Sequence, residues 1–322
     1  MDETRQALSD CLGEFPETPD PDVERVSAER ADGFERHLIE FAVEPDERIR
    51  AYLLVPDEVT AGDSTAEVDP ATDRPGVLAI HSHGGEFERG KSDPGGVTDR
   101  PGADYGAALA QRGYVVLCPD LLPFEDRRPA DSDLPGRPST GDDHERFAAM
   151  DALLRGSTLQ AKYLSDLSVA LDVLAGHPLV DPDALGAIGH SLGGQETLWL
   201  AWYEDRLTAA VAASGVARLA DIQREQILHN DALYVPGLLA VGDMDAVSAG
   251  AAPTALYVST GTDDSIFPVE SVEAVIDATA DAYDAAGIPE RFASRVFDGG
   301  HEFPEAVRTE GYDWLDRWLG GE

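Results

Sequence analysis

Lysine is almost absent from this chain, and positive charge of any kind is scarce. The 322 residues include 24 lysines and arginines but 62 aspartates and glutamates, so the formal net charge is −38. Lys91 and Lys162 are the two lysines. A surface this acidic repels phosphate backbones and anionic lipids, so we expect no nucleic-acid or membrane partner. The charge predicts a halophilic protein whose repulsion is screened by concentrated salt, with an ordinary acidic protein as the alternative.

Cysteines and long apolar runs are also rare. Cys11 and Cys118 are too few for a disulfide framework and have no metal-binding spacing. No apolar run reaches the roughly 18 residues of a membrane helix, and the acidic N-terminus lacks the apolar core of a secretion signal. These absences favour a soluble, cytoplasmic protein. The 43% of hydrophobic residues is enough for a sizeable core, and the sequence leaves the oligomeric state open.

The order of the predicted elements indicates an α/β protein. A helix over 2–13 and a linker over 15–21 precede a hairpin of strands over 35–43 and 48–55, and a polar surface loop follows over 57–74. From Gly76 on, short apolar runs alternate with helical segments, which predicts a mostly parallel sheet with helices on both faces. The strands are expected over 77–81, 114–119, 185–189, 207–213, 255–259 and 292–297, and the helices over 103–112, 158–175, 193–203, 269–286 and 304–319.

We therefore expect one domain over residues 31–322, preceded by an N-terminal extension over residues 1–30. Two connections, 121–157 and 216–253, are longer than most loops in compact domains. Each follows a strand on the carboxyl side of the sheet, where open α/β sheets bind their ligands. Both inserts are predicted to cap the functional site.

A nucleophile motif follows the strand at 185–189. Gly189-His190-Ser191-Leu192-Gly193 matches G-x-S-x-G and stands between a strand and a helix. The glycines permit a tight turn that exposes the Ser191 hydroxyl, and the helix N-terminus supplies amides for an oxyanion. Glu196, in the first turns of this helix, is expected to complement the helix dipole. A glycine-rich turn without chemistry is the alternative.

A serine nucleophile needs a histidine base and an acid, which in this fold class follow it in the order acid, then histidine. Only His301, on a glycine-rich loop after the last strand, follows both Ser191 and an acid-bearing strand end. Asp264 is preferred over the adjacent Asp263 as the acid. Two further acids, Asp243 and Asp245, remain as alternatives, and other histidines that could line the site are His190 and His229.

The strand at 77–81 ends in His81-Ser-His83-Gly84-Gly85, where a second oxyanion donor is expected. We assign the donors to the amides of Leu192 and Gly85. A zinc site at His81 and His83 is disfavoured because no third clustered ligand is present, so we predict neither a metal nor a cofactor. Residues that could contact the substrate are His83, Gly84, His190, Arg127 and Arg128, although ion pairs with nearby acids are the simpler interpretation of the two arginines.

Together these motifs resemble the α/β-hydrolase superfamily over about residues 35–320. The segments that carry the resemblance are Gly-His-Ser191-Leu-Gly-Gly-Gln-Glu, His-Ser-His-Gly-Gly-Glu-Phe-Glu-Arg-Gly-Lys91 and Gly-Gly-His301. The branch they resemble most is the dienelactone hydrolase and acetyl xylan esterase-like group. Dienelactone hydrolases use a cysteine nucleophile where this chain has Ser191, so the resemblance implies hydrolysis of carboxylic esters rather than lactones.

The sequence thus predicts a serine esterase that acts on a small-molecule ester through Ser191, His301 and Asp264. Three alternatives stay open. Two change the bond that is cleaved: a lactone hydrolase of the dienelactone type, and a peptidase of the prolyl-oligopeptidase type. The third is a catalytically silent hydrolase fold that acts as a binding protein. The acidic surface favours a neutral ester.

Overall fold

The computed structural model describes residues 3–57 and 74–320. The surface loop predicted over 57–74 therefore lies, except for its two end residues, outside the described residues. Within the described ranges, no helix has both the length and the hydrophobicity needed to cross a membrane.

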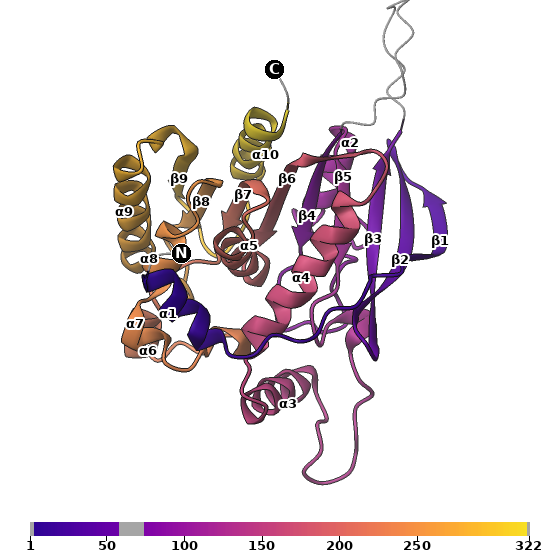
Figure 1. The fold of residues 1–322 in the computed structure, drawn as a ribbon, viewed down its shortest axis with the longest axis horizontal. Coiled ribbons are helices and arrows are strands. Elements are labelled where there is room, and N and C mark those ends of the chain that lie inside the picture. Colours follow the sequence, from indigo (N-terminus) through magenta and orange to yellow (C-terminus); the bar gives the residue numbers. More distant parts are fainter. Residues whose placement is uncertain (1–2, 58–73, 321–322) are drawn as a thin grey trace, which may run out of the picture.

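One sheet runs through the molecule, and in the described residues it has nine strands in the order β1-β2-β3-β5-β4-β6-β7-β8-β9 (Figure 1). The first three strands and β5 pair antiparallel, and all pairs from β5 to β9 are parallel. The strands are β1 Glu24–Arg30, β2 Phe34–Glu44, β3 Glu47–Pro56, β4 Arg74–Ile80, β5 Val115–Pro119, β6 Val180–His190, β7 Leu207–Ala213, β8 Ala255–Gly261 and β9 Phe292–Phe297.

Helices cover both faces of this sheet, with a hydrophobic core on each side. On one face lie α1, α4, α5, α8 and α9, and on the other α2 and α10. The inner strands β5 and β8 are buried at every residue, as expected for strands covered on both faces. The helices are α1 Glu3–Leu12, α2 Tyr105–Gln111, α3 Gly141–Leu154, α4 Leu159–Ala175, α5 Leu192–Tyr203, α6 Leu219–Arg224, α7 Leu238–Val241, α8 Met244–Ala249, α9 Val269–Ala285 and α10 Glu305–Leu319.

The predicted α/β architecture is confirmed, including the antiparallel hairpin, now β2 and β3. Every strand and helix predicted from residue 77 on is present, with ends that differ by a few residues. The sequence pattern did not predict β1, which lies in the stretch expected to be an N-terminal extension. All seven residues of β1 are exposed, so the strand has no apolar alternation that could reveal it.

Both lysines lie in clusters of three carboxylates. The Lys91 ammonium is 2.7 Å from Asp120 and Glu125 and 2.8 Å from Asp126. Burial alone would lower the pKa of Lys91, but these three carboxylates more than reverse that effect and raise it. Lys162 is bound in the same way, by Glu44, Glu47 and Asp166. Each ammonium has three hydrogens in a compact head and can donate one to each of its three carboxylates.

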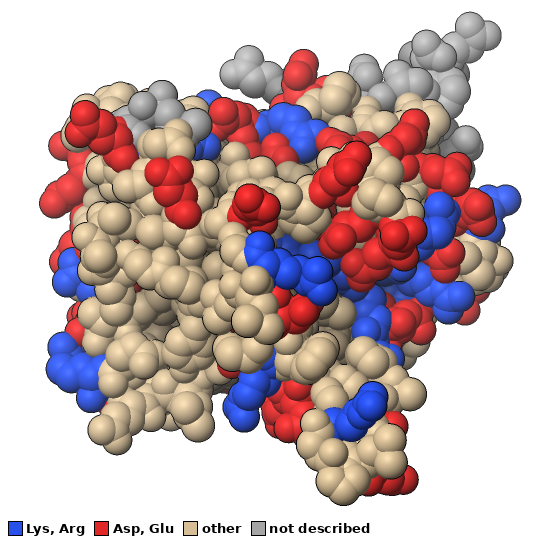
Figure 2. Space-filling view, turned by 60° about the horizontal axis from the view of Figure 1, so that its bottom comes forward, with Lys and Arg blue, Asp and Glu red and all other residues tan. Residues whose placement is uncertain are grey.

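On the face shown in Figure 2, the basic side chains lie next to Asp and Glu side chains. The two long inserts both reach the carboxyl end of the sheet. The first contains the 3₁₀ turn Glu125–Arg127 and α3, which projects from the body of the molecule, and the second contains α6, the 3₁₀ turn η2 (Asp231–Leu233), α7 and α8. Helix α3 packs on α4 and on η2, so the two inserts meet.

Candidate active site

The turn between β6 and α5 holds Ser191 in a strained conformation. Ser191 has φ 59° and ψ −121°, a region that residues with a side chain rarely adopt, and it is the N-cap of α5. A Cβ on Gly193 would overlap the carbonyl oxygen of Ile80, and one on Gly189 would overlap the backbone of Gly193. The glycines of the motif are therefore required by close backbone packing, and the turn that the motif predicts is present.

The structure brings Ser191, His301 and Asp264 together at the carboxyl end of the sheet. His301 Nε2 lies 2.9 Å from Ser191 Oγ, and His301 Nδ1 lies 2.8 Å from Asp264 Oδ2. The Asp264 carboxylate accepts a hydrogen from Nδ1, which leaves Nε2 free to accept the Ser191 hydroxyl. The three residues come from the end of β6, the loop after β8 and the loop after β9.

The surroundings of Asp264 keep it ionised. Its side chain is fully buried, and its Oδ1 accepts hydrogen bonds from the amides of Ile266 and Phe267, both at 3.0 Å. Burial alone would raise the pKa of Asp264, but the hydrogen bond and charge interaction with His301, together with the two amides, lower it. The carboxylate is thus fixed by three donors and can orient the imidazole.

The alternative acids lie elsewhere. Asp263 is exposed beside Asp264. The carboxylate of Asp243 accepts from the amides of Leu219 and Ala220 in the second insert, and Asp245 forms an ion pair with Arg218. None of these side chains contacts His301.

Two other histidines lie behind the site in neutral form. His190 Nδ1 donates to the Ser82 hydroxyl at 3.1 Å, and its ring lies 5.0 Å from the His301 ring. Burial, reinforced by repulsion from His301, lowers the pKa of His190 to about 3. His190 is not among the residues that line the cavity described below, so the structure gives no support to the predicted substrate contact. His81 is fully buried with both ring nitrogens occupied by the backbone of Ser82 and Leu121, and burial lowers its pKa to about 4.

The loop after β4 contradicts the predicted role of Gly85. The Gly85 amide donates to His83 Nδ1 at 3.0 Å, so it is not available to an oxyanion. The amides of His83 and Gly84 have no acceptor within the described part of the chain. Leu192 is the first residue of α5, where a backbone N–H has no acceptor within the helix. The Leu192 amide is therefore available to an oxyanion, as predicted. On the loop after β4, the amides without an acceptor in the described residues include those of His83 and Gly84.

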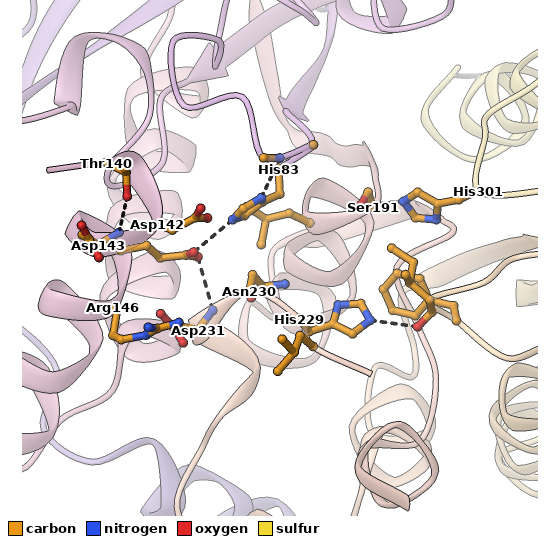
Figure 3. Close-up of a pocket in the computed structure, with 17 residues that line it drawn as sticks. His83, Thr140, Asp142, Asp143, Arg146, Ser191, His229, Asn230, Asp231 and His301 are labelled. Atoms are coloured by element: carbon orange, nitrogen blue, oxygen red, sulfur yellow. Dashed lines mark hydrogen bonds and ion pairs between the residues drawn. The ribbon is translucent and has the colours of Figure 1, made fainter. Parts of the chain in front are cut away.

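A cavity of about 710 Å³ opens next to Ser191 and His301 (Figure 3). His83, Gly84 and Gly85 of the loop after β4 line it, as do His229 and Asn230 from the second insert. The wall opposite Ser191 is acidic and comes mainly from α3 and η2, with Asp142, Asp143, Glu145 and Asp231 and a single cation, Arg146.

The structure does not bring Arg127 or Arg128 to this cavity. Arg127 is buried and forms ion pairs with Glu47 and Asp166, both at 2.7 Å. Arg128 pairs with Glu88 and Asp131. The predicted substrate contacts are wrong, and ion pairing among the many acids is what holds these side chains.

One group of acids in the described residues has the spacing of a cation site, namely Asp120, Glu125 and Asp126. The Lys91 ammonium already lies within hydrogen-bonding distance of all three. Its charge takes the position that a metal ion would need, so this cluster is an internal ion-pair network.

A buried chain of polar side chains connects α5 to α4 and to the second insert. Glu196 Oε2 accepts from Gln160 Nε2 at 2.6 Å and Oε1 from Gln195 Nε2 at 3.0 Å, and Gln195 Oε1 accepts from Asn230 Nδ2 at 3.0 Å. Glu196 is fully buried, and its expected interaction with the helix dipole stays a prediction. Burial raises the pKa of Glu196 to about 8, although the two amide donors act in the opposite direction.

Replacing Glu196 by glutamine is expected to change how stability depends on pH. An acid whose pKa is higher in the folded state binds its proton more tightly there, so its contribution is complete below the unfolded value of 4.5 and is lost as pH rises to about 8. Between pH 5 and 8 the free energy of unfolding should fall on the order of a few kcal/mol more in the wild type than in Glu196→Gln. Denaturant unfolding at constant high salt measures this, and parallel pH profiles would contradict it.

The sheet, the strained turn after β6 and the serine, acid and histidine in this chain order define the α/β-hydrolase fold. The chain belongs to the dienelactone hydrolase family, whose sequence model matches residues 92–312. A curated relative, YtaP of Bacillus subtilis (strain 168), named as a hydrolase, is 28% identical over 98% of this chain and 99% of its own length.

Solved structures extend the likeness of the fold. A glucuronoyl esterase from Solibacter usitatus superposes with a TM-score of 0.68 at 14% identity, over 100% of this chain and 93% of that chain. Acetyl xylan esterase 1 from Thermoanaerobacterium sp. superposes with a TM-score of 0.58 at 16% identity, over 99% of each chain. At these identities the shared property is the fold.

Proposed function

We propose that this protein is a serine esterase that hydrolyses carboxylic esters of small molecules through an acyl-enzyme. The observation that carries the proposal is the continuous hydrogen-bonded series of Ser191, His301 and Asp264 beside an open cavity. His301 Nε2 takes the Ser191 proton as Oγ attacks the ester carbonyl, and Asp264 stabilises the imidazolium that forms. The alcohol leaves with that proton, and water activated by the same nitrogen then releases the acid.

The oxyanion of the tetrahedral intermediate is stabilised by the Leu192 amide and by a free amide of His83 or Gly84. One such preorganised donor contributes about 3 kcal/mol to the stability of the transition state. The positive end of the α5 dipole acts at the same point. These donors replace the pair assigned from the sequence, in which Gly85 was the second member.

The charge of the cavity wall supports an uncharged substrate. The acidic wall contains four carboxylates and one cation, Arg146. Neither Arg127 nor Arg128 supplies a second cation, because both pair with acids elsewhere. A substrate that carries its own carboxylate meets repulsion there. Among the structural neighbours are esterases whose names refer to acetylated xylan and to glucuronoyl esters, so acetylated sugars belong in the substrate panel.

A turnover panel in molar KCl tests the function. We expect neutral acetate esters, including p-nitrophenyl acetate and acetylated sugars, to have a kcat/KM at least about tenfold above matched anionic esters, lactones and amides. A faster lactone or amide would favour the dienelactone or peptidase alternative. No turnover of any compound, together with no reaction with a fluorophosphonate, would favour a silent fold.

A further inference from the structure

Glu145 connects three parts of the candidate active site. It lies on α3 in the first insert, and only 3% of the residue is exposed. Its Oε2 is 3.0 Å from His83 Nε2 on the loop after β4, and its Oε1 accepts from the amide of Asp231 in the second insert at 3.3 Å. In Figure 3, where Glu145 has no label, the two contacts are the dashed lines that start at His83 and at Asp231. A single buried carboxylate therefore joins both inserts to the loop that carries the free amides.

The hydrogen bonds determine the protonation of His83. The Gly85 amide donates to Nδ1, so this nitrogen carries no hydrogen, and the hydrogen of the neutral ring lies on Nε2 and points to Glu145. The ring also makes edge contacts with Phe87 and Phe124, with centroids at 4.9 and 5.1 Å. His83 is thus held at both nitrogens and packed against two aromatic rings, and it has no free nitrogen for a substrate.

The turn that His83 controls needs an external constraint. Gly84 and Gly85 have φ values of 57° and 69°, and two consecutive glycines have more backbone freedom than any other pair. The bond from the Gly85 amide to the His83 ring closes this turn on itself. An oxyanion donor is effective only when its direction is fixed before the reaction, so the orientation of the His83 ring matters to the amides of His83 and Gly84.

We propose that Glu145 is a positioning residue of this hydrolase, which fixes the His83 ring and through it the turn that presents the second oxyanion donor. This inference rests on the proposed esterase function and adds a residue whose hydrogen bonds go to His83 and Asp231 and not to Ser191, His301 or Asp264. It also assigns a role to the first insert. Docking of α3 through Glu145 completes the site, so the insert acts on the rate of the chemical step as well as on access.

Four variants test the proposal with p-nitrophenyl acetate. Glu145→Leu is expected to lower kcat by about 10- to 100-fold with KM changed less than about threefold, because the loss concerns the transition state. Glu145→Gln can keep its oxygen as the acceptor for His83 Nε2 and loses only the longer contact with the Asp231 amide, so it should lose less than about fivefold. His83→Phe should match Glu145→Leu, and the double variant should fall no more than about twofold below His83→Phe, since both changes remove the same support.

Asp151→Leu on the same helix is the matched control, because it removes an acid that contacts Arg155 outside the site. It should keep wild-type kcat, and circular dichroism with thermal unfolding verifies that each variant is folded. The proposal is overturned if Glu145→Leu keeps wild-type kcat, or if the losses of the two single variants multiply in the double variant. If Glu145→Leu does not fold, His83→Phe decides alone, and wild-type kcat in that variant overturns the proposal. An inactive wild type would instead refute the esterase function.

Discussion

Replacement of Ser191 by alanine is expected to lower ester turnover by at least about 10⁴-fold, because the nucleophile of the acyl-transfer step is removed. The residual rate would come from binding and from the oxyanion donors. The change deletes one hydroxyl in a turn that the backbone itself maintains, so the free energy of unfolding should stay within about 1 kcal/mol of the wild type. Initial rates with p-nitrophenyl acetate and denaturant unfolding measure the two quantities.

Ser259 provides the matched control for this variant. It is buried on β8, and its hydroxyl has no hydrogen-bond partner in the ranges that the structure describes. Ser259→Ala removes the same group from a position outside the site and should keep turnover within about twofold of the wild type. Turnover by Ser191→Ala at the rate of Ser259→Ala would show that another group carries the reaction.

Asp264→Asn is expected to lower kcat by about 10⁴-fold. The reason lies in the amides of Ile266 and Phe267, which both donate to Oδ1. In asparagine the carbonyl oxygen would be held by those two donors, so the NH₂ group would face His301 Nδ1. His301 would then carry its hydrogen on Nε2 and could not accept the proton of Ser191. The measurement is kcat for p-nitrophenyl acetate over a range of pH.

Asp263→Asn is the control that the chain itself offers, one residue away. Asp263 is exposed and its side chain has no hydrogen-bond or ion-pair partner among residues 3–57 and 74–320, so this variant should keep kcat within about twofold. Because the two substitutions change the overall charge equally, general electrostatics cannot separate them. Equal losses in both variants, or a loss at Asp263 alone, would reject Asp264 as the acid.

The parts of the site that follow from chain order were predictable from the sequence. The Ser191 turn needs glycines at fixed spacing, and Asp264 and His301 follow at the ends of later parallel strands. Parallel strands place such ends at one edge of the sheet, so local motifs were sufficient to bring the three residues together. The same reasoning recovers the alternation of strands and helices, since fully buried strands appear as continuous apolar runs.

The parts that depend on pairing between distant side chains were not predictable. The Gly85 amide looked available as a donor until the structure placed His83 Nδ1 against it, and the orientation of His83 depends in turn on Glu145, far along the chain. Arg127 lies in a long insert whose sequence does not reveal that Asp166 on α4 is its partner. In a chain with so many acids, the composition favours an ion pair for every arginine but does not indicate which acid is the partner.

The two lysines illustrate the same limit. Their persistence among arginines was visible in the sequence, but the three carboxylates that surround each ammonium could be identified only from the fold. Adaptation to concentrated salt stays a prediction from the net charge of −38. Stability measured from low to molar KCl addresses it, and a constant free energy of unfolding would remove that interpretation.

The central claim is that Ser191 is a nucleophile activated by His301, and covalent labelling tests it most directly. A fluorophosphonate reacts only with a serine whose hydroxyl is activated by a base. Peptide mass spectrometry of the labelled wild type should locate one adduct per chain, on Ser191, with none in Asp264→Asn on the same time scale. An unlabelled protein, or an adduct at a different residue, would contradict the account.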